Sequence, residues 1–156
     1  MGFALSVIVF WLARPSVESW IAGASIGLSG EALRVWAAGH LEKSREVTSS
    51  GPYRFLRHPL YAGSALIGIG LAIASRNLAA ALIIGAYLGL TLNAARRSEE
   101  AHLREKFGEA YDAYSSGRSE PTSRRFSLRR AFVNREHHAL VGLVAGLAAL
   151  AWKSGL

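Results

Sequence analysis

The sequence predicts an all-α integral membrane protein, a single domain over residues 1–156 folded as a bundle of about four to five transmembrane helices. The chain is 51% hydrophobic and only 19% charged, with long apolar runs. Its net charge of +7 is segregated, because fourteen of the eighteen Lys and Arg lie in two stretches, 43–57 and 96–135. This distribution is typical of membrane proteins and not of basic soluble domains. We therefore expect the lipid bilayer as a partner and no nucleic acid.

Four segments of the chain approach the length of a transmembrane helix, which needs about 20 mainly apolar residues, or about 17 at the short end. In chain order they are 20–41, 59–75, 78–95 and 138–152. The opening run 2–13 is too short to cross alone and stops at Arg14 and Pro15. We expect this run to be part of a first span or of a hairpin.

Pairs of glycines one helical turn apart occur within these expected spans. The spacing lets helix backbones approach closely in lipid, so we expect close packing at each pair, while the oligomeric state stays open. The pairs are Gly23 and Gly27, Gly85 and Gly89, and Gly142 and Gly146.

The cations predict the orientation of the spans, because loops rich in Lys and Arg face the cytoplasm. The loops 42–58 and 96–136 then lie on the cytoplasmic side, and the tight turn 75–77 lies outside. Both basic loops fall on the same side under this arrangement. We expect the protein in the inner (plasma) membrane, with these loops in the cytoplasm.

Several classes of site are excluded by what the chain lacks. It contains no cysteine, which rules out disulfides and thiolate-ligated metals. It also has no phosphate-binding glycine loop, dinucleotide fingerprint, Gly-x-Ser-x-Gly elbow or His-Glu-x-x-His motif. Three histidines at the ends of expected spans have no acidic partner at metal-ligand spacing, so we expect no metal site. They are His40, His137 and His138.

The segment 48–63 carries the densest cluster of chemistry-bearing residues. Pro59 suits the first position of the next helix, which places His58 at or beside the helix cap. The free N–H groups and positive dipole end of that helix favour a carboxylate or a phosphate. Several residues converge there and predict a site at the cytoplasmic rim. They are Arg57, His58 and Tyr61, and just before them Tyr53 and Arg54. Tyr53 and Arg54, taken alone, also fit membrane-interface anchors.

A second cluster follows the span 78–95. Helical spacing places five residues on one stripe along a helix face, namely Glu99, Leu103, Phe107, Ala110 and Tyr114. Glu99 is therefore expected to face inward and to approach His58, whereas Glu100 is expected to pair with Arg104 as a solvated surface charge. An interfacial amphipathic helix is the alternative interpretation of this stripe.

Two charged residues, Glu31 and Arg34, interrupt the expected span 20–41. Ionisable residues inside a membrane favour a functional interpretation. Their i,i+3 spacing equally allows mutual neutralisation on one helix, so both interpretations stay open.

The two clusters together resemble a known family. Gly51–Gly63 reads Gly-Pro-Tyr-Arg-x-x-Arg-His-Pro-x-Tyr-x-Gly, and Glu99–Tyr111 reads Glu-Glu-x-x-Leu-x-x-x-Phe-Gly-x-x-Tyr. In this order, about forty residues apart, they resemble the isoprenylcysteine carboxyl methyltransferase family, which is grouped with the membrane-embedded phospholipid methyltransferases. The resemblance covers roughly residues 20–115 and leaves 138–152 as an additional C-terminal span.

The resemblance implies a multi-span enzyme with a cofactor site at its cytoplasmic rim. Such an enzyme transfers a methyl group from S-adenosyl-L-methionine to a lipophilic or small-molecule acceptor, which is a carboxylate, an amine or a thiol. The cofactor contacts that it implies are Glu46, Val47, Thr48, Tyr53, His58, Pro59, Leu60, Tyr61 and Glu99. Arg57 joins them because its charge, beside the helix start at Pro59, suits the cofactor carboxylate. His58 and Glu99 are the catalytic candidates, since an amine acceptor needs a base.

Two positions depart from the protein-methylating members of that family. Arg45 stands where they have a histidine, and Ala95 stands where they have an arginine associated with the substrate. Cofactor use is thus more strongly implied than a prenyl-cysteine substrate. The alternatives from other classes are an NADPH-dependent membrane reductase of the sterol-reductase type and a non-catalytic membrane protein.

Overall fold

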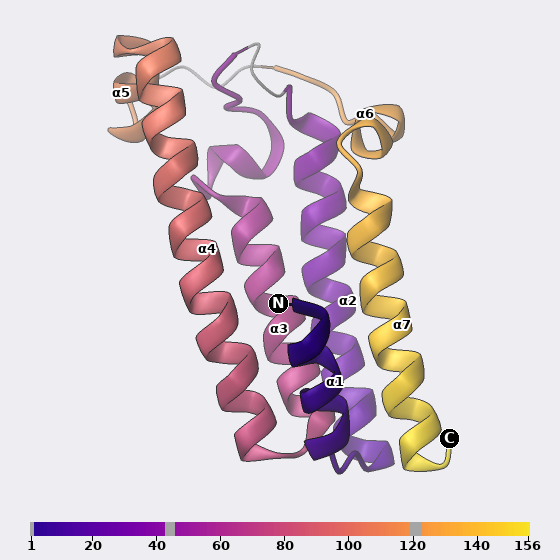
Figure 1. Cartoon of the computed structure of the whole chain (residues 1–156). Helices are drawn as coiled ribbons and strands as arrows, with labels where there is room; N and C mark the ends of the chain where they lie inside the picture. The colour runs from indigo at the N-terminus through magenta and orange to yellow at the C-terminus, as the bar shows by residue number, and fades with distance from the viewer. Residues whose placement is uncertain (1, 43–45, 119–122) are drawn as a thin grey trace.

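A computed structural model describes residues 2–42, 46–118 and 123–156 of the protein. Within these residues helices form and no strand occurs, so the all-α prediction is confirmed. Four long helices run side by side, and α1 lies against the lower half of the bundle they form (Figure 1). They are α2 (Val17–His40), α3 (Pro59–Ser75), α4 (Leu78–Phe107) and α7 (Glu136–Ser154), while α1 covers Gly2–Leu12.

The short elements α5 and α6 lie at the upper end of the bundle in Figure 1, opposite the α3–α4 turn. They cover Glu109–Ser115 and Leu128–Val133, and the 3-10 helix η1 (Gly51–Arg54) leads into α3. Both expected cytoplasmic loops thus meet at one end. Arg45, one of the two positions that depart from the family pattern, lies outside the described residues.

The helices agree with the expected spans in position but only partly in length and apolarity. α3 has the expected bounds, and α4 continues beyond residue 95 to Phe107. Among the described helices, α4 is the one long and apolar enough to cross a membrane by itself, while α1 and α3 are apolar but shorter. The four to five spans therefore stay a prediction, and α1 is a separate short helix that ends before Arg14 and Pro15.

Glycines bring α2 and α3 into backbone contact. A Cβ at Gly30 would lie 2.6 Å from the carbonyl oxygen of Gly63, and a Cβ at Gly23 would collide with the backbone at Gly70. Packing this close is possible only without side chains. The expected packing role is thus confirmed at Gly23, whereas Gly85 and Gly89 of α4 face open space.

Local signals in the sequence set the helix ends. Ser16 and Ser19 form a reciprocal capping box at the start of α2. α3 ends at Arg76, which adopts a left-handed conformation with φ of 45°. The Asn77 side chain then accepts a hydrogen bond from the Ala80 N–H at 3.0 Å and starts α4. The expected tight turn 75–77 is confirmed.

The C-terminal part of the chain closes the upper end of α2. The last carbonyl groups of a helix have no partner within it, and here the Asn134 amide donates to the carbonyls of Ala38 at 2.9 Å and Leu41 at 3.0 Å. The Arg130 guanidinium also donates to the Gly39 carbonyl and pairs with Glu42 at 3.0 Å. α6 and Asn134, which follows it, are therefore packed against this end of α2.

Candidate functional site

His58 stands at the start of α3, where the sequence predicts the centre of a site. Pro59 occupies the first turn and is fully buried, because a proline has no N–H to leave unpaired there. The carbonyl of His58 accepts from the N–H groups of Tyr61 and Ala62, but its side chain makes no capping hydrogen bond. The imidazole is thus not used to end the helix and points elsewhere.

The His58 imidazole lies between two carboxylates of α4. Its Nε2 is 2.8 Å from Oε1 of Glu100, while its Nδ1 is 4.0 Å from Oε2 of Glu99. Glu99 approaches His58 as expected, but the expectation for Glu100 is wrong. Glu100 holds the hydrogen bond and is the less exposed of the two, with 29% against 41% of its side chain accessible.

The expected stripe is interrupted at the end of α4. The stripe predicts one helix as far as Tyr114, but α4 ends at Phe107 and is followed by Gly108, which adopts φ of 46°. The residues beyond Gly108 therefore say nothing about which carboxylate of α4 faces α3. Arg104 does not neutralise Glu100 as expected, because its guanidinium pairs with Asp112 of α5 at 3.2 Å.

Tyr61 completes the cluster on α3. Its ring lies beside the His58 imidazole, with the two ring centroids 5.6 Å apart. Its hydroxyl interacts with the carboxylate of Glu99. His58, Tyr61, Glu99 and Glu100 thus form one connected polar group, which we call the rim cluster.

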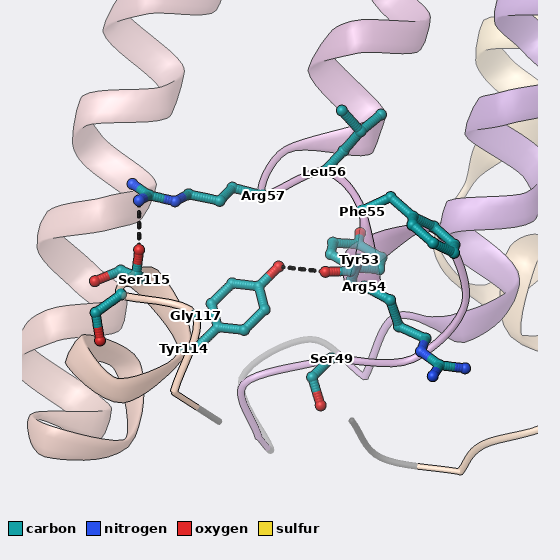
Figure 2. A pocket seen from close by; sticks show the side chains of 10 residues that line it. Ser49, Tyr53, Arg54, Phe55, Leu56, Arg57, Tyr114, Ser115 and Gly117 are labelled. Carbon is teal, nitrogen blue, oxygen red and sulfur yellow. Dashed lines mark hydrogen bonds between the residues drawn. The ribbon is translucent and has the colours of Figure 1, made fainter. Parts of the chain in front are cut away.

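A cavity of about 530 Å³ lies next to the rim cluster, between the approach to α3 and helix α5. Figure 2 shows the hydroxyl of Tyr114 donating to the Tyr53 carbonyl, at 3.0 Å, and the Arg57 guanidinium donating to the Ser115 carbonyl. These contacts hold α5 against the loop before α3. The residues that line the cavity are Ser49, Tyr53, Arg54, Phe55, Leu56, Arg57, Tyr114, Ser115, Ser116 and Gly117.

Two tyrosines of this cavity are held in their neutral form. Burial raises the pKa of Tyr114 to about 12, and burial together with the charge of Glu99 raises the pKa of Tyr53 well above its usual range. Both hydroxyls therefore remain hydrogen-bond donors at neutral pH. The wall combines donor groups with the cations of Arg54 and Arg57.

The ten predicted cofactor contacts fall into three places. Tyr53 and Arg57 line the cavity, and His58, Pro59, Leu60, Tyr61 and Glu99 belong to the start of α3 and the facing part of α4. Glu46, Val47 and Thr48 lie in the loop after α2.

The residues of that loop contact the end of α2 and the C-terminal segment. Glu46 pairs with Arg124 at 2.7 Å. Thr48 is buried and accepts a hydrogen bond from the Glu42 N–H at 3.3 Å. Their partners are thus structural, and the geometry shows no contact of these residues with the rim cluster.

The part of the cavity that α5 supplies was not expected from the sequence. Ser115, Ser116 and Gly117 were not singled out, and Tyr114 was placed on a continuous helix. The signal that marks the fold-back is Gly108 after Phe107, since a glycine directly after a helical run commonly ends it in a left-handed conformation.

The fold and the site define a helical protein with a polar cavity and a histidine–carboxylate cluster at one end. A model of the phospholipid methyltransferase family matches residues 2–110, so the chain belongs to this family of membrane methyltransferases. The resemblance carried by Gly51–Gly63 and Glu99–Tyr111 is thereby confirmed. The match favours methyl transfer over the reductase alternative, and it begins before the expected residue 20, at α1.

Two curated proteins are similar to the chain. One is the nickel-cobalt-cadmium resistance protein NccN of Alcaligenes xylosoxydans xylosoxydans, 31% identical over 63% of this chain and 49% of that protein. The other is the cobalt-zinc-cadmium resistance protein CzcN of Cupriavidus metallidurans, 29% identical over 69% of this chain and 53% of that protein. The chain spans about half the length of these relatives. No solved structure matches the chain significantly.

Proposed function

We propose that the protein is a multi-span membrane methyltransferase that uses S-adenosyl-L-methionine and methylates a lipophilic acceptor at the cytoplasmic face of the inner membrane. The observation that carries this proposal is the position of His58, at the start of α3, with Glu100 at 2.8 Å and Glu99 at 4.0 Å. The family match supports the reaction class, and the adjacent cavity supports a bound cofactor.

The residues present fit this cofactor. The cavity of about 530 Å³ falls within the range of about 300–1,000 Å³ usual for small-molecule sites. Arg57 donates one N–H group to the Ser115 carbonyl. A guanidinium has further N–H groups, which can hold a carboxylate. The neutral Tyr53 and Tyr114 offer ring faces and donors to the remainder of the molecule.

When bound, the cofactor would supply a methyl group on a positively charged sulfonium. The acceptor would form a bond to the methyl carbon in line as the carbon–sulfur bond breaks, and the sulfur would leave as a neutral thioether. The chain has to align the two reactants and exclude water, and good alignment contributes about 7–11 kcal/mol to such a step. The carboxylates of Glu99 and Glu100 favour positive charge at the rim. Burial of Pro59 keeps the start of α3, and with it His58, in a fixed place.

Besides contacting the cofactor, His58 would act as a general base when the acceptor is an amine. Its hydrogen bond to Glu100 fixes the orientation of the imidazole, in the way a carboxylate orients a histidine base. A carboxylate acceptor needs no base, and His58 would then act only through its contact with the cofactor.

The test is methyl transfer by purified wild-type protein, His58→Ala and His102→Ala, with labelled S-adenosyl-L-methionine and a lipid extract of the producing cells. His102 lies on the same part of α4 but is exposed, so its substitution serves as the matched control. We expect His58→Ala to lower turnover at least tenfold, which corresponds to about 1.4 kcal/mol, while its thermal stability stays near that of the control. Absence of cofactor binding by the wild type in calorimetry, or normal turnover of His58→Ala, would contradict the proposal.

A further inference from the structure

The short helix α6 has two different faces, of which one is packed against α2. Ala131 is 5% exposed and lies on this inner face, where Arg130 and Asn134 donate to the end of α2. On the outer face three large apolar side chains are between 66% and 70% exposed. They are Leu128, Phe132 and Val133. No part of the chain that the structure describes covers this outer face, which is large for a helix of six residues.

α6 is held in a fixed orientation at its beginning. The Ser127 side chain accepts from the Arg130 N–H at 3.3 Å, and the Ser127 N–H donates to the Gly39 carbonyl at 3.1 Å. The Phe126 ring packs so closely on Gly39 that a Cβ there would collide with it, and it lies 5.9 Å from the His40 ring between centroids. The outer face of α6 is therefore turned away from α2 by these contacts.

Three guanidinium groups on and around the outer face have no carboxylate partner among the described residues. They are Arg125, Arg129 and Arg135, and all three are exposed. Two neighbouring arginines differ, because Arg124 pairs with Glu46 at 2.7 Å and Arg130 pairs with Glu42 at 3.0 Å. Both of these carboxylates are thus already neutralised, and the exposed arginines leave an excess of positive charge.

α6 lies at the end of the bundle where the Arg-rich loops meet, directly before α7 (Figure 1). The chain changes direction between these helices at Arg135, which adopts φ of 63°. The next residue, Glu136, is buried and pairs with Arg34 at 3.0 Å. Further along α7, Val141 and Val144 are apolar and exposed.

The exposed valines of α7 relate α6 to a bilayer. Val141 lies about 8 Å along α7 from Glu136, which is close to the thickness of one headgroup layer. A bilayer whose hydrocarbon covers Val141 would therefore bring its headgroups to the level of α6.

We propose that the outer face of α6 is a docking surface for the anionic phospholipid headgroups of the adjacent membrane leaflet. The apolar side chains enter the boundary of the acyl chains, and the three exposed guanidinium groups bind phosphate oxygens, to which their planar N–H groups are suited. Apolar residues combined with arginines are typical of segments that lie in a membrane interface, and a basic segment beside a span attracts anionic lipids. The surface lies outside the family match, which ends at residue 110, and it does not depend on methyl transfer.

Two double variants with the same change in charge test this assignment. Arg125→Gln/Arg129→Gln removes two cations at α6, and Arg96→Gln/Arg97→Gln removes two exposed cations of α4 on the same expected side of the membrane. The wild type and both variants are purified in a nonionic detergent and titrated with phosphatidylglycerol or with phosphatidylcholine of the same acyl chains. Native mass spectrometry then measures the fraction of protein that retains lipid.

We expect the wild type and the α4 variant to retain phosphatidylglycerol at least fivefold more than phosphatidylcholine, and the α6 variant to retain both lipids equally. Equal retention of the two lipids by the wild type would overturn the proposal. The same loss in both double variants would also overturn it, because the effect would then follow net charge alone. A dimer without bound lipid that the α6 variant loses would assign the face to a second copy of the chain instead.

A spin label at Leu128→Cys, in this chain without other cysteines, measures the position of the outer face directly. In nanodiscs that contain phosphatidylglycerol, we expect the label to be accessible to oxygen and at least fivefold less accessible to a water-soluble nickel chelate than a label at the exposed Glu105→Cys of α4. Equal access of nickel to the two positions would place α6 in water and overturn the proposal. This measurement decides the assignment even when the α6 double variant is poorly produced.

Discussion

At the scale of single residues, the rim cluster depends on which carboxylate of α4 meets His58. Two adjacent glutamates on a helix point about 100° apart, with 3.6 residues per turn, so a small error in phase exchanges their roles. The structure gives the hydrogen bond to Glu100 at 2.8 Å and the interaction with Tyr61 to Glu99. Each carboxylate therefore has its own partner on α3.

The two carboxylates should affect different kinetic quantities. Glu100→Gln removes a charge-assisted hydrogen bond worth about 1.5–3 kcal/mol and should lower turnover at saturating cofactor about tenfold or more, because His58 loses its orienting partner. Glu99→Gln should instead weaken cofactor binding, measured by calorimetry. The exposed Glu105→Gln on the same helix is the control. Equal effects of the first two variants on one quantity would show that the carboxylates act as a unit.

At the scale of elements, two contacts decide how the site is built. The α2–α3 contact positions the start of α3, and the fold-back at Gly108 brings α5 over the loop that precedes it. Neither contact is sufficient to form the site alone. The rim cluster and the cavity beside it form because these two contacts fix the positions of α3, α4 and α5 relative to one another.

Gly30→Ala and Gly89→Ala should change stability in opposite directions. The Cβ at Gly30 would lie 2.6 Å from the Gly63 carbonyl oxygen, and overpacking of this kind costs about 1–3 kcal/mol. The Cβ at Gly89 meets nothing within 4 Å, so the higher helix propensity of alanine should stabilise α4 by up to about 1 kcal/mol. Thermal unfolding in detergent measures both, and a stable Gly30→Ala would show that α2 and α3 are less closely packed.

Tyr114→Phe tests the attachment of α5. The variant loses the hydrogen bond to the Tyr53 carbonyl, of 3.0 Å, and should unfold with about 0.5–1.5 kcal/mol less free energy at neutral pH. Burial raises the pKa of Tyr114 to about 12, above the usual value of about 10 for an unfolded chain. The hydroxyl thus stabilises the fold fully below about pH 10, and that contribution is lost as the pH rises through about 12.

The measurement is unfolding free energy against pH for the wild type and Tyr114→Phe. Between about pH 10 and 12 the wild type should lose stability more steeply than the variant. Parallel curves for the two proteins would mean that the Tyr114 hydroxyl is not held in the cavity wall.

At the scale of the whole molecule, the two ends of α3 separate two chemically different regions. The upper end carries the rim cluster, α5 and α6, and the lower end carries the turn to α4 (Figure 1). With 17 residues α3 is about 26 Å long, close to the roughly 30 Å of a bilayer's hydrocarbon core. We therefore expect its two ends at opposite membrane faces.

The topology can be tested with single cysteines, because the chain contains none. Arg54 and Leu78 are exposed and lie near opposite ends of α3. In intact cells, an impermeant maleimide should label Leu78→Cys from outside and Arg54→Cys only after permeabilisation, since the Arg-rich loop is expected in the cytoplasm. Labelling of both from the same side would contradict the orientation and the proposed cytoplasmic site.

The amino-acid sequence alone was enough to predict the helical fold, the bounds of α3, the turn at 75–77 and the family. These depend on local signals, namely apolar runs, a proline at a helix start and motif spacing, which do not require knowledge of distant contacts. It also placed His58 beside α4, because consecutive spans joined by a short turn are neighbours.

The tertiary structure alone decided which glutamate bonds to His58, where α5 lies, and what Arg34 contacts. Mutual neutralisation of Arg34 and Glu31, three residues apart, was one of two open interpretations, but the close partner of Arg34 is Glu136, which is 102 positions further along the chain. Helix phase, a fold-back at one glycine and a long-range ion pair are set by the packing of whole elements. A single sequence carries no direct record of that packing, so these features became visible only when the helices were assembled.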